Sequence, residues 1–230
     1  QAENYWIYQD GQSAPIIFNG SASRRSKTAD KEVPTGTVMG YGMGRLTVAL
    51  PDRVTFRLGD LIFGSSGTPI NGYRDSILKF TENDFLNEGG DFVARVFGAP
   101  SSAGQITAIK NVSQLDSSLG QGPQMIFTNY TIFSINAPFD RTTWKDLTSP
   151  IQSVAMLDYG AVSQQGTNPT NGDIYYRSII GVQSLILARR QFGEPGNTPI
   201  SSEMDRIFQY DTDRLLQYES SVNFDNRQLR

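Results

Sequence analysis

Apolar and polar residues alternate along several short stretches of the chain, and this period of two is typical of β-strands with one buried face. The two clearest cases are predicted hairpins, which pair 45–50 with 54–58 around Pro51-Asp52, and 124–128 with 131–135 around Asn129-Tyr130. Each strand of these hairpins is short, and each turn contains residues that favour tight turns. The pattern therefore indicates a β-sheet protein with many short connections.

Further short strands are predicted on the same grounds, at 5–8, 15–18, 76–80, 106–109, 151–157 and 174–176. Asp10-Gly11 and Asn19-Gly20 follow the first two, and glycine supplies the positive φ that tight turns require. Residues 21–34 are polar and charged without periodicity, so we expect a surface loop there. Residues 185–190 fit either the extension of a strand or the start of a helix.

Helical signals gather in one place and predict a short helical insert over 198–218. Ser202 with Asp205 resembles a capping box. The apolar residues that follow have the spacing of one helix face, and we expect them to contact the core: Met204, Ile207, Phe208, Leu215 and Leu216.

Together these elements predict a mainly β protein of propeller-like blades, each made of antiparallel strands. At 44–48, 123–127 and 172–176, a small or rigid residue comes just before an apolar strand that has a nearby partner strand. We expect residues 1–230 to form a single propeller-like domain or part of one, although a two-sheet sandwich would give the same pattern. We also expect the chain to be a fragment of a longer polypeptide, because it stops within an expected strand pair.

Composition narrows the possible partners. The formal net charge is −3, so the chain lacks the basic footprint of a nucleic-acid-binding protein. Arg24-Arg25 and Arg189-Arg190 are isolated pairs, which we expect at the surface or in an interface. A mildly acidic wall would let DNA pass without holding it. No apolar run approaches the roughly 18 residues of a membrane-spanning helix, so no such segment is expected.

The absence of His and Cys excludes a Ser-His-Asp triad, a histidine-bound zinc ion and thiolate or disulfide chemistry. The glycine-rich stretch Gly40–Gly44 leads into a strand, whereas a phosphate-binding loop leads into a helix. The remaining candidate acid pairs are Asp75 with Glu82, Glu194 with Glu203, and Asp211 with Asp213. Asp211 and Asp213 fit helix caps and Glu203 the first turn of a helix, so catalysis is not favoured.

Two other groups of residues were weighed as ligand contacts. Three acidic residues in or beside turns are single and scattered, so we expect turn stabilisation rather than calcium binding: Asp10, Asp173 and Asp225. Three aromatic residues are able to stack on sugars, but packing between sheets or subunits is favoured: Trp6, Tyr175 and Tyr176. The sequence thus predicts no catalytic, cofactor-binding or metal-binding residue, no cofactor and no enzyme activity.

Seven segments occur in a familiar order: Trp6–Gly11, Pro15–Gly20, Gly120–Pro123, Phe139–Trp144, Asn171–Asp173, Gly196–Ser201 and Asn223–Arg227. Together they resemble the β-propeller region of tail nozzle (tail tubular protein B-like) virion proteins of short-tailed phages. The resemblance runs from about residue 5 to the end of the chain. Nozzle proteins are much longer than this chain, which agrees with the expected fragment.

The resemblance implies a non-enzymatic structural subunit located in the virion, in the phage tail. Such subunits form a homo-oligomeric ring, usually a hexamer, which contacts the tail adaptor and tail fibre proteins. The ring continues the channel through which DNA passes, and helps to retain and eject the genome. The alternative from a different class is a carbohydrate-binding or carbohydrate-cleaving β-propeller, which predicts an exposed aromatic cluster beside two facing carboxylates.

Overall fold

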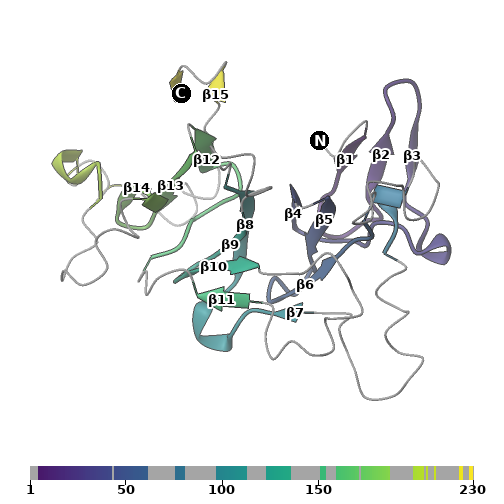
Figure 1. Ribbon diagram of the computed structural model, residues 1–230, viewed down its shortest axis with the longest axis horizontal. Helices are drawn as coiled ribbons and strands as arrows, with labels where there is room; N and C mark the ends of the chain where they lie inside the picture. Colours follow the sequence, from purple (N-terminus) through teal and green to yellow (C-terminus); the bar gives the residue numbers. More distant parts are fainter. Residues whose placement is uncertain are drawn as a thin grey trace, which may run out of the picture. The chain divides into compact units, whose positions relative to one another are not determined.

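The computed structural model describes residues 5–42, 44–61, 76–80, 97–112, 123–135, 151–153, 159–170, 172–186, 199–204, 206, 210, 223–224 and 228–229. These residues form small antiparallel sheets and short 3₁₀ helices (Figure 1). The predicted mainly β class is therefore confirmed. The chain divides into two compact units, one of residues 1–99 with 136–150 and the other of residues 100–135 with 151–230.

The first unit contains two antiparallel sheets whose strands follow one another in the sequence. One sheet has the order β1 (Trp6–Tyr8), β2 (Ile16–Phe18) and β3 (Ser23–Arg25). The other has the order β4 (Val38–Gly42), β5 (Arg45–Ala49), β6 (Thr55–Leu58) and β7 (Phe97–Gly98). Two 3₁₀ helices accompany them, η1 (Thr28–Asp30) and η2 (Ser76–Leu78).

The second unit also consists of antiparallel sheets whose strands follow one another in the sequence. One sheet contains β8 (Ile106–Asn111), β9 (Gln124–Thr128), β10 (Ile132–Ile135) and β11 (Ile151–Ser153). A second contains β12 (Thr167–Thr170), β13 (Asp173–Ser178) and β14 (Gly181–Ser184), and a third pairs β15 (Asn223–Phe224) with β16 (Gln228–Leu229). The 3₁₀ helices here are η3 (Ser101–Ala103) and η6 (Ser202–Met204).

Each unit has its own apolar core, to which two sheets contribute. In the first unit, Ile17 of β2 packs in one cluster with Leu46 and Val48 of β5 and with Ile77 and Leu78 of η2. In the second unit, β8, β9 and β10 contribute to a cluster that also contains Ile174 and Tyr176 of β13. The rings of Phe127 and Tyr176 lie 5.4 Å apart between centroids. The apolar side chains of these strands therefore form the two cores.

Both predicted hairpins are confirmed. β5 pairs with β6, and the carboxylate of Asp52 accepts hydrogen bonds from the N–H groups of Val54 and Thr55 in the turn. β9 pairs with β10 around Asn129-Tyr130. β6 has one buried face, as expected, whereas every residue of β5 is buried because β5 is the inner neighbour of both β4 and β6.

Two expected elements differ in the structure. The predicted strand 76–80 is wrong, because residues 76–78 form the 3₁₀ helix η2, in which Ile77 and Leu78 are both buried. The expected surface loop 21–34 contains β3 and η1, and Val33 within it is 2% exposed. Ser26 helps to fold this stretch inward, since its hydroxyl donates to the Val33 carbonyl oxygen at 2.7 Å.

The described part of the expected insert 198–218 is residues 199–204, 206 and 210, and it contains the short helix η6. Asp205 and the expected helical residues Ile207, Phe208, Leu215 and Leu216 lie outside the described residues, as do 154–157 of the expected strand 151–157. No helix within the described ranges is long and apolar enough to cross a membrane.

Candidate functional site

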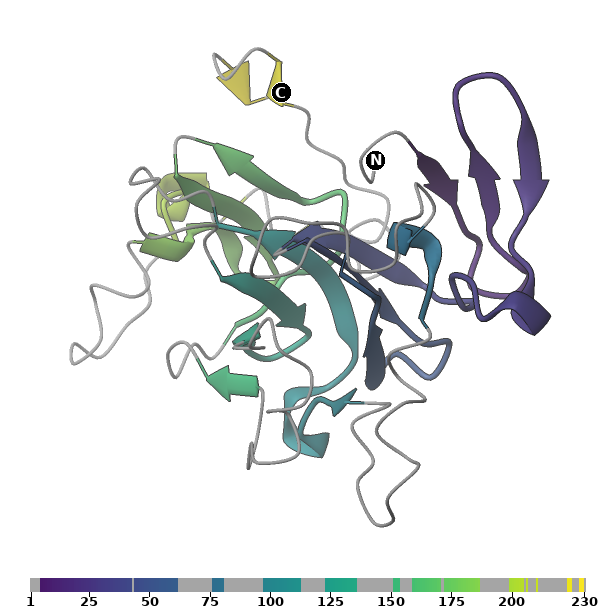
Figure 2. The same ribbon diagram turned by 45° about the vertical axis from the view of Figure 1, so that its right-hand side comes forward.

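The sheet β1–β2–β3 presents two chemically different faces, because successive residues of a strand point to opposite sides. The register pairs Tyr8 with Ile16 and Ile16 with Arg25, so these three side chains share one side. Trp6 and Phe18 lie on the same side at the other end of the two strands. We call this side the outer face; Figure 2 shows the three purple strands of the sheet side by side. The inner face carries Ile7, Ile17 and Arg24.

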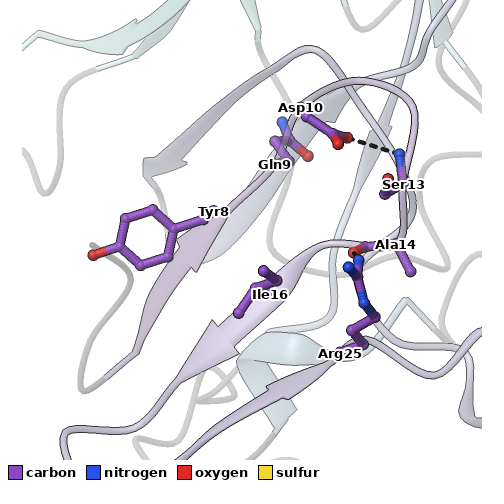
Figure 3. Close-up of a pocket in the computed structure, with 7 residues that line it drawn as sticks. All are labelled: Tyr8, Gln9, Asp10, Ser13, Ala14, Ile16 and Arg25. Carbon is purple, nitrogen blue, oxygen red and sulfur yellow. Dashed lines mark hydrogen bonds between the residues drawn. The ribbon is translucent and has the colours of Figure 1, made fainter.

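The outer face is exposed. Trp6, Tyr8 and Ile16 have between 39% and 57% of their surface open to solvent, whereas Ile17 on the inner face is 2% exposed. At the end of this face, a pocket of about 230 Å³ opens beside Tyr8 and Ile16 (Figure 3). Its lining combines apolar and polar groups from β1, β2, β3 and the β1–β2 turn: Tyr8, Gln9, Asp10, Ser13, Ala14, Ile16 and Arg25.

The β1–β2 turn shapes the polar rim of the pocket. The carboxylate oxygen Oδ1 of Asp10 accepts the N–H groups of Ser13 at 2.7 Å and of Gln12 at 2.9 Å. These hydrogen bonds, that of Ser13 first, lower the pKa of Asp10 to about 2. Gly11 has φ +80, the positive value expected for this turn. Asp10 thus stabilises the turn, as predicted, and presents a negative charge at neutral pH.

Arg25 supplies the positive charge of the pocket from the neighbouring strand β3. Its Nη1 donates to the backbone oxygen of Ala14 at 3.0 Å, which ties β3 to the chain just before β2 (Figure 3). Among the described residues Arg25 forms no ion pair. Part of its guanidinium donor set therefore remains available to a partner.

Gln9 also lines the pocket, but its polar atoms do not face solvent. Both atoms of its carboxamide are buried, and neither has a hydrogen-bond partner among the described residues. A buried amide without partners costs about 1–3 kcal/mol per group. The groups that the pocket offers to a ligand are one aromatic residue, apolar walls, a carboxylate and a guanidinium.

The inner side of the same sheet is fixed by a charge network. Glu32 accepts two hydrogen bonds from Arg24, at 2.6 and 2.8 Å, and lies 3.4 Å from the ammonium group of Lys79. Burial raises the pKa of Glu32, but the hydrogen bonds from Arg24 and from the Lys27 N–H outweigh burial and hold the pKa at about 2. This network joins β3 to the residues that follow η2 and has a structural role.

The second unit exposes another group of large apolar side chains. Ile179 lies in the β13–β14 turn, and Ile200 and Met204 belong to the segment with η6. Each of them is between 47% and 52% exposed, and we call the three together the apolar tip. The segment is held against β14, because Ile200 N–H donates to Val182 O and Val182 N–H donates to Ser201 Oγ, both at 2.9 Å.

The sequence-derived candidates are placed as follows. Asp173 is buried and accepts the N–H groups of Ile174 and Ile186, so it stabilises the start of β13. Tyr176 packs in the core, as favoured, whereas Trp6 is exposed. The exposed residue Glu203 is described, but its proposed partner and the other candidates lie outside the described residues: Asp75, Glu82, Arg189, Arg190, Glu194, Asp211, Asp213 and Asp225.

The residues that line the pocket do not stand out as a group in the sequence. A signal was available in the two strands that flank it, since Trp6-Ile7-Tyr8 and Ile16-Ile17-Phe18 are apolar at every position. Strands that are apolar on both faces are typical of sheets covered on both sides. Within the described ranges no group of three acidic or other metal-ligating residues converges, and the pocket contains one carboxylate rather than a facing pair.

Comparisons with models of known protein families, with curated proteins and with solved structures found no match.

Proposed function

We propose that the protein is a non-enzymatic structural subunit that assembles with copies of itself into a ring, of the tail nozzle kind that its sequence resembles. The observation that carries this proposal is the mismatch between sequence and burial in β1 and β2. Both strands are apolar on both faces, yet Trp6, Tyr8 and Ile16 on the outer face are 39–57% exposed, whereas Ile17 on the inner face is 2% exposed. Covering the outer face in an assembly would remove about 25 cal/mol of unfavourable hydration free energy per Å² of apolar area.

The sheet topology supports a propeller-like arrangement within this proposal. Each described sheet is an antiparallel meander of strands consecutive in the sequence, with two sheets of four strands, two of three and one of two. Four-stranded antiparallel meanders are the blades of β-propellers. In a propeller or a ring of propellers, neighbouring blades protect the edge strands that isolated sheets would expose.

In this role the subunit would act by being rigid. The ring would continue the DNA channel of the tail, between the adaptor and the fibre proteins, and its mildly acidic composition would keep passing DNA from adhering. The pocket offers one carboxylate, Asp10, whose low pKa suits a permanent charge rather than a general acid. The described pocket therefore favours contact with a partner over hydrolysis of a sugar.

A ring also requires two different contact surfaces on each subunit. Rings with more than two subunits form through heterologous contacts, in which two different surfaces of the same chain meet. The described residues provide two separate apolar surfaces, the outer face in the first unit and the apolar tip in the second. A dimer through one surface alone would need only one of them.

Sedimentation velocity over a range of concentrations tests the proposal. We expect the protein to form a discrete species larger than a dimer, and the variant with Trp6→Ser and Tyr8→Ser to remain a monomer with an unchanged circular dichroism spectrum. A wild-type protein that stays monomeric at every concentration contradicts the proposal. Glycan-array binding by that monomer, lost in the same variant, would establish the carbohydrate-binding alternative.

A further inference from the structure

The segment that carries Ile200 and Met204 of the apolar tip lies closely against β14. Gly181 in β14 lets the segment with η6 approach closely, because a Cβ atom at this position would lie 2.6 Å from Ser201 Oγ. The hydrogen bonds between this segment and Val182 then fix the segment on β14. Met204 ends η6 with its side chain exposed, and its neighbour Glu203 is also exposed. The tip therefore presents a flexible apolar side chain next to a negative charge.

The size and the lining of the pocket suit an apolar side chain. Its volume of about 230 Å³ corresponds to about eight waters at roughly 30 Å³ each, which suits one long apolar side chain. Tyr8 is one of the residues that line it, and methionine sulfur makes favourable contacts with aromatic rings. Arg25, which has no ion pair among the described residues, stands at the rim, where a neighbouring carboxylate would meet it. The tip and the pocket thus each offer an apolar contact, and Glu203 and Arg25 offer one pair of opposite charges, while Asp10 adds a negative charge to the pocket rim.

We propose that Met204 of one copy inserts into the pocket beside Tyr8 of the next copy, and that Glu203 then pairs with Arg25. This inference rests on the proposed self-assembly and specifies which surfaces meet. An aromatic-lined pocket filled by one anchoring side chain, with a charge pair at its rim, is the usual form of an interface hot spot. The contact is heterologous, so each copy uses its pocket for one neighbour and its tip for the other.

Charge reversal tests the pairing in the full chain. We expect Arg25→Glu and Glu203→Arg each to weaken assembly at least about tenfold, because like charges then face each other at a contact that excludes water. The matched control is Arg53→Glu, which makes the same charge change at an exposed residue of the β5–β6 turn. This control variant should assemble like the wild type, as measured by sedimentation velocity.

Mixing the two variants gives the decisive result. In an equimolar mixture, the unchanged acidic tip of the Arg25→Glu variant meets the unchanged basic pocket of the Glu203→Arg variant. The reversed basic tip of the Glu203→Arg variant meets the reversed acidic pocket of the Arg25→Glu variant. Every contact between the two variants therefore joins opposite charges again, and we expect the mixture to regain the wild-type assembly.

Three outcomes decide the inference. Restored assembly in the mixture supports the pairing of the tip with the pocket. If both single variants assemble normally, or if both fail and mixing does not restore assembly, the proposed pairing is overturned. If the wild type itself does not assemble, the proposed function has failed before this contact is reached.

Discussion

Both faces of the sheet β1–β2–β3 carry apolar residues of β1 and β2, but only the side chains of the inner face enter a core cluster within the described residues. On the inner face, Ile17 is buried against β5 and η2, and Arg24 is paired with buried Glu32. On the outer face, Tyr8 and Ile16 remain exposed beside a pocket whose Arg25 has no ion pair among the described residues. The same three short strands therefore serve the fold on one side and, we propose, an assembly on the other.

The difference between the two faces separates effects on the free energy of unfolding from effects on association. A substitution on the inner face should change the free energy of unfolding, because its partners belong to the same chain. A substitution on the outer face should change association and leave folding nearly unaffected, because its partners belong to another copy. A substitution on the inner face that changes only association, or one on the outer face that changes the free energy of unfolding, would contradict this assignment.

The largest effect is expected for Ile17→Ala. This substitution removes a fully buried side chain from the core cluster, and such changes cost about 2–5 kcal/mol of unfolding free energy. Chemical denaturation monitored by circular dichroism measures the loss. The matched control is Ile16→Ala, the exposed neighbour on the same strand, for which the change should stay within about 0.5 kcal/mol. Equal losses for both positions would contradict the assignment of the two faces.

A smaller effect is expected for Glu32→Gln, which removes the charge at the centre of the inner network. The side chains of Arg24 and Lys79 are 41% and 29% exposed, so solvent screening limits the cost to about 1–2 kcal/mol. The pKa of Glu32 is lowered from 4.5 to about 2 in the folded state, so this stabilisation is fully present above pH 4.5.

The same pKa shift predicts a pH dependence. Stability contributed by Glu32 should be lost as the pH falls from about 4.5 to about 2, because the unfolded chain takes up the proton first. The Glu32→Gln variant should lose less stability than the wild type over this window. Parallel curves for the two proteins between these pH values would show that the network does not stabilise the fold.

The smallest effect on folding is expected for Tyr8→Ser, which removes an exposed ring of the outer face. The unfolding free energy of the monomer should change by no more than about 0.5 kcal/mol. Association should nevertheless fall by at least about tenfold, since Tyr8 lines the pocket. A variant that unfolds more readily but assembles normally would reverse the expected order.

The sequence predicted those elements whose signal is local. The hairpins at β5–β6 and β9–β10 have alternating apolar residues and turn residues within a few positions, so period and turn chemistry agree. β3 was missed because Ser23-Arg24-Arg25 contains no apolar residue, and it forms through its backbone pairing with β2 and through the distant residue Glu32. η2 was mistaken for a strand because two consecutive core residues fit either element.

The pocket depends on contacts that no local pattern contains. Tyr8 and Arg25 share one side only because β2 pairs with β1 and with β3 in one particular register. A shift of one residue would move either side chain to the opposite face. One feature of the sequence was informative, because β1 and β2 are apolar on both faces. This pattern predicts that the outer face is covered, but it does not identify what covers it.

Disulfide crosslinking tests the central claim most directly, because the natural chain contains no cysteine. Ala14→Cys places a thiol in the pocket lining, Met204→Cys places one on the apolar tip, and Arg53→Cys is an exposed control. When single variants are mixed and oxidised, we predict that Ala14→Cys with Met204→Cys gives a covalent dimer on a non-reducing gel, well above the yield of Arg53→Cys with Met204→Cys or of any variant alone. Equal yields in all mixtures, or dimers from Ala14→Cys alone, would contradict the insertion of the tip of one copy into the pocket of the next.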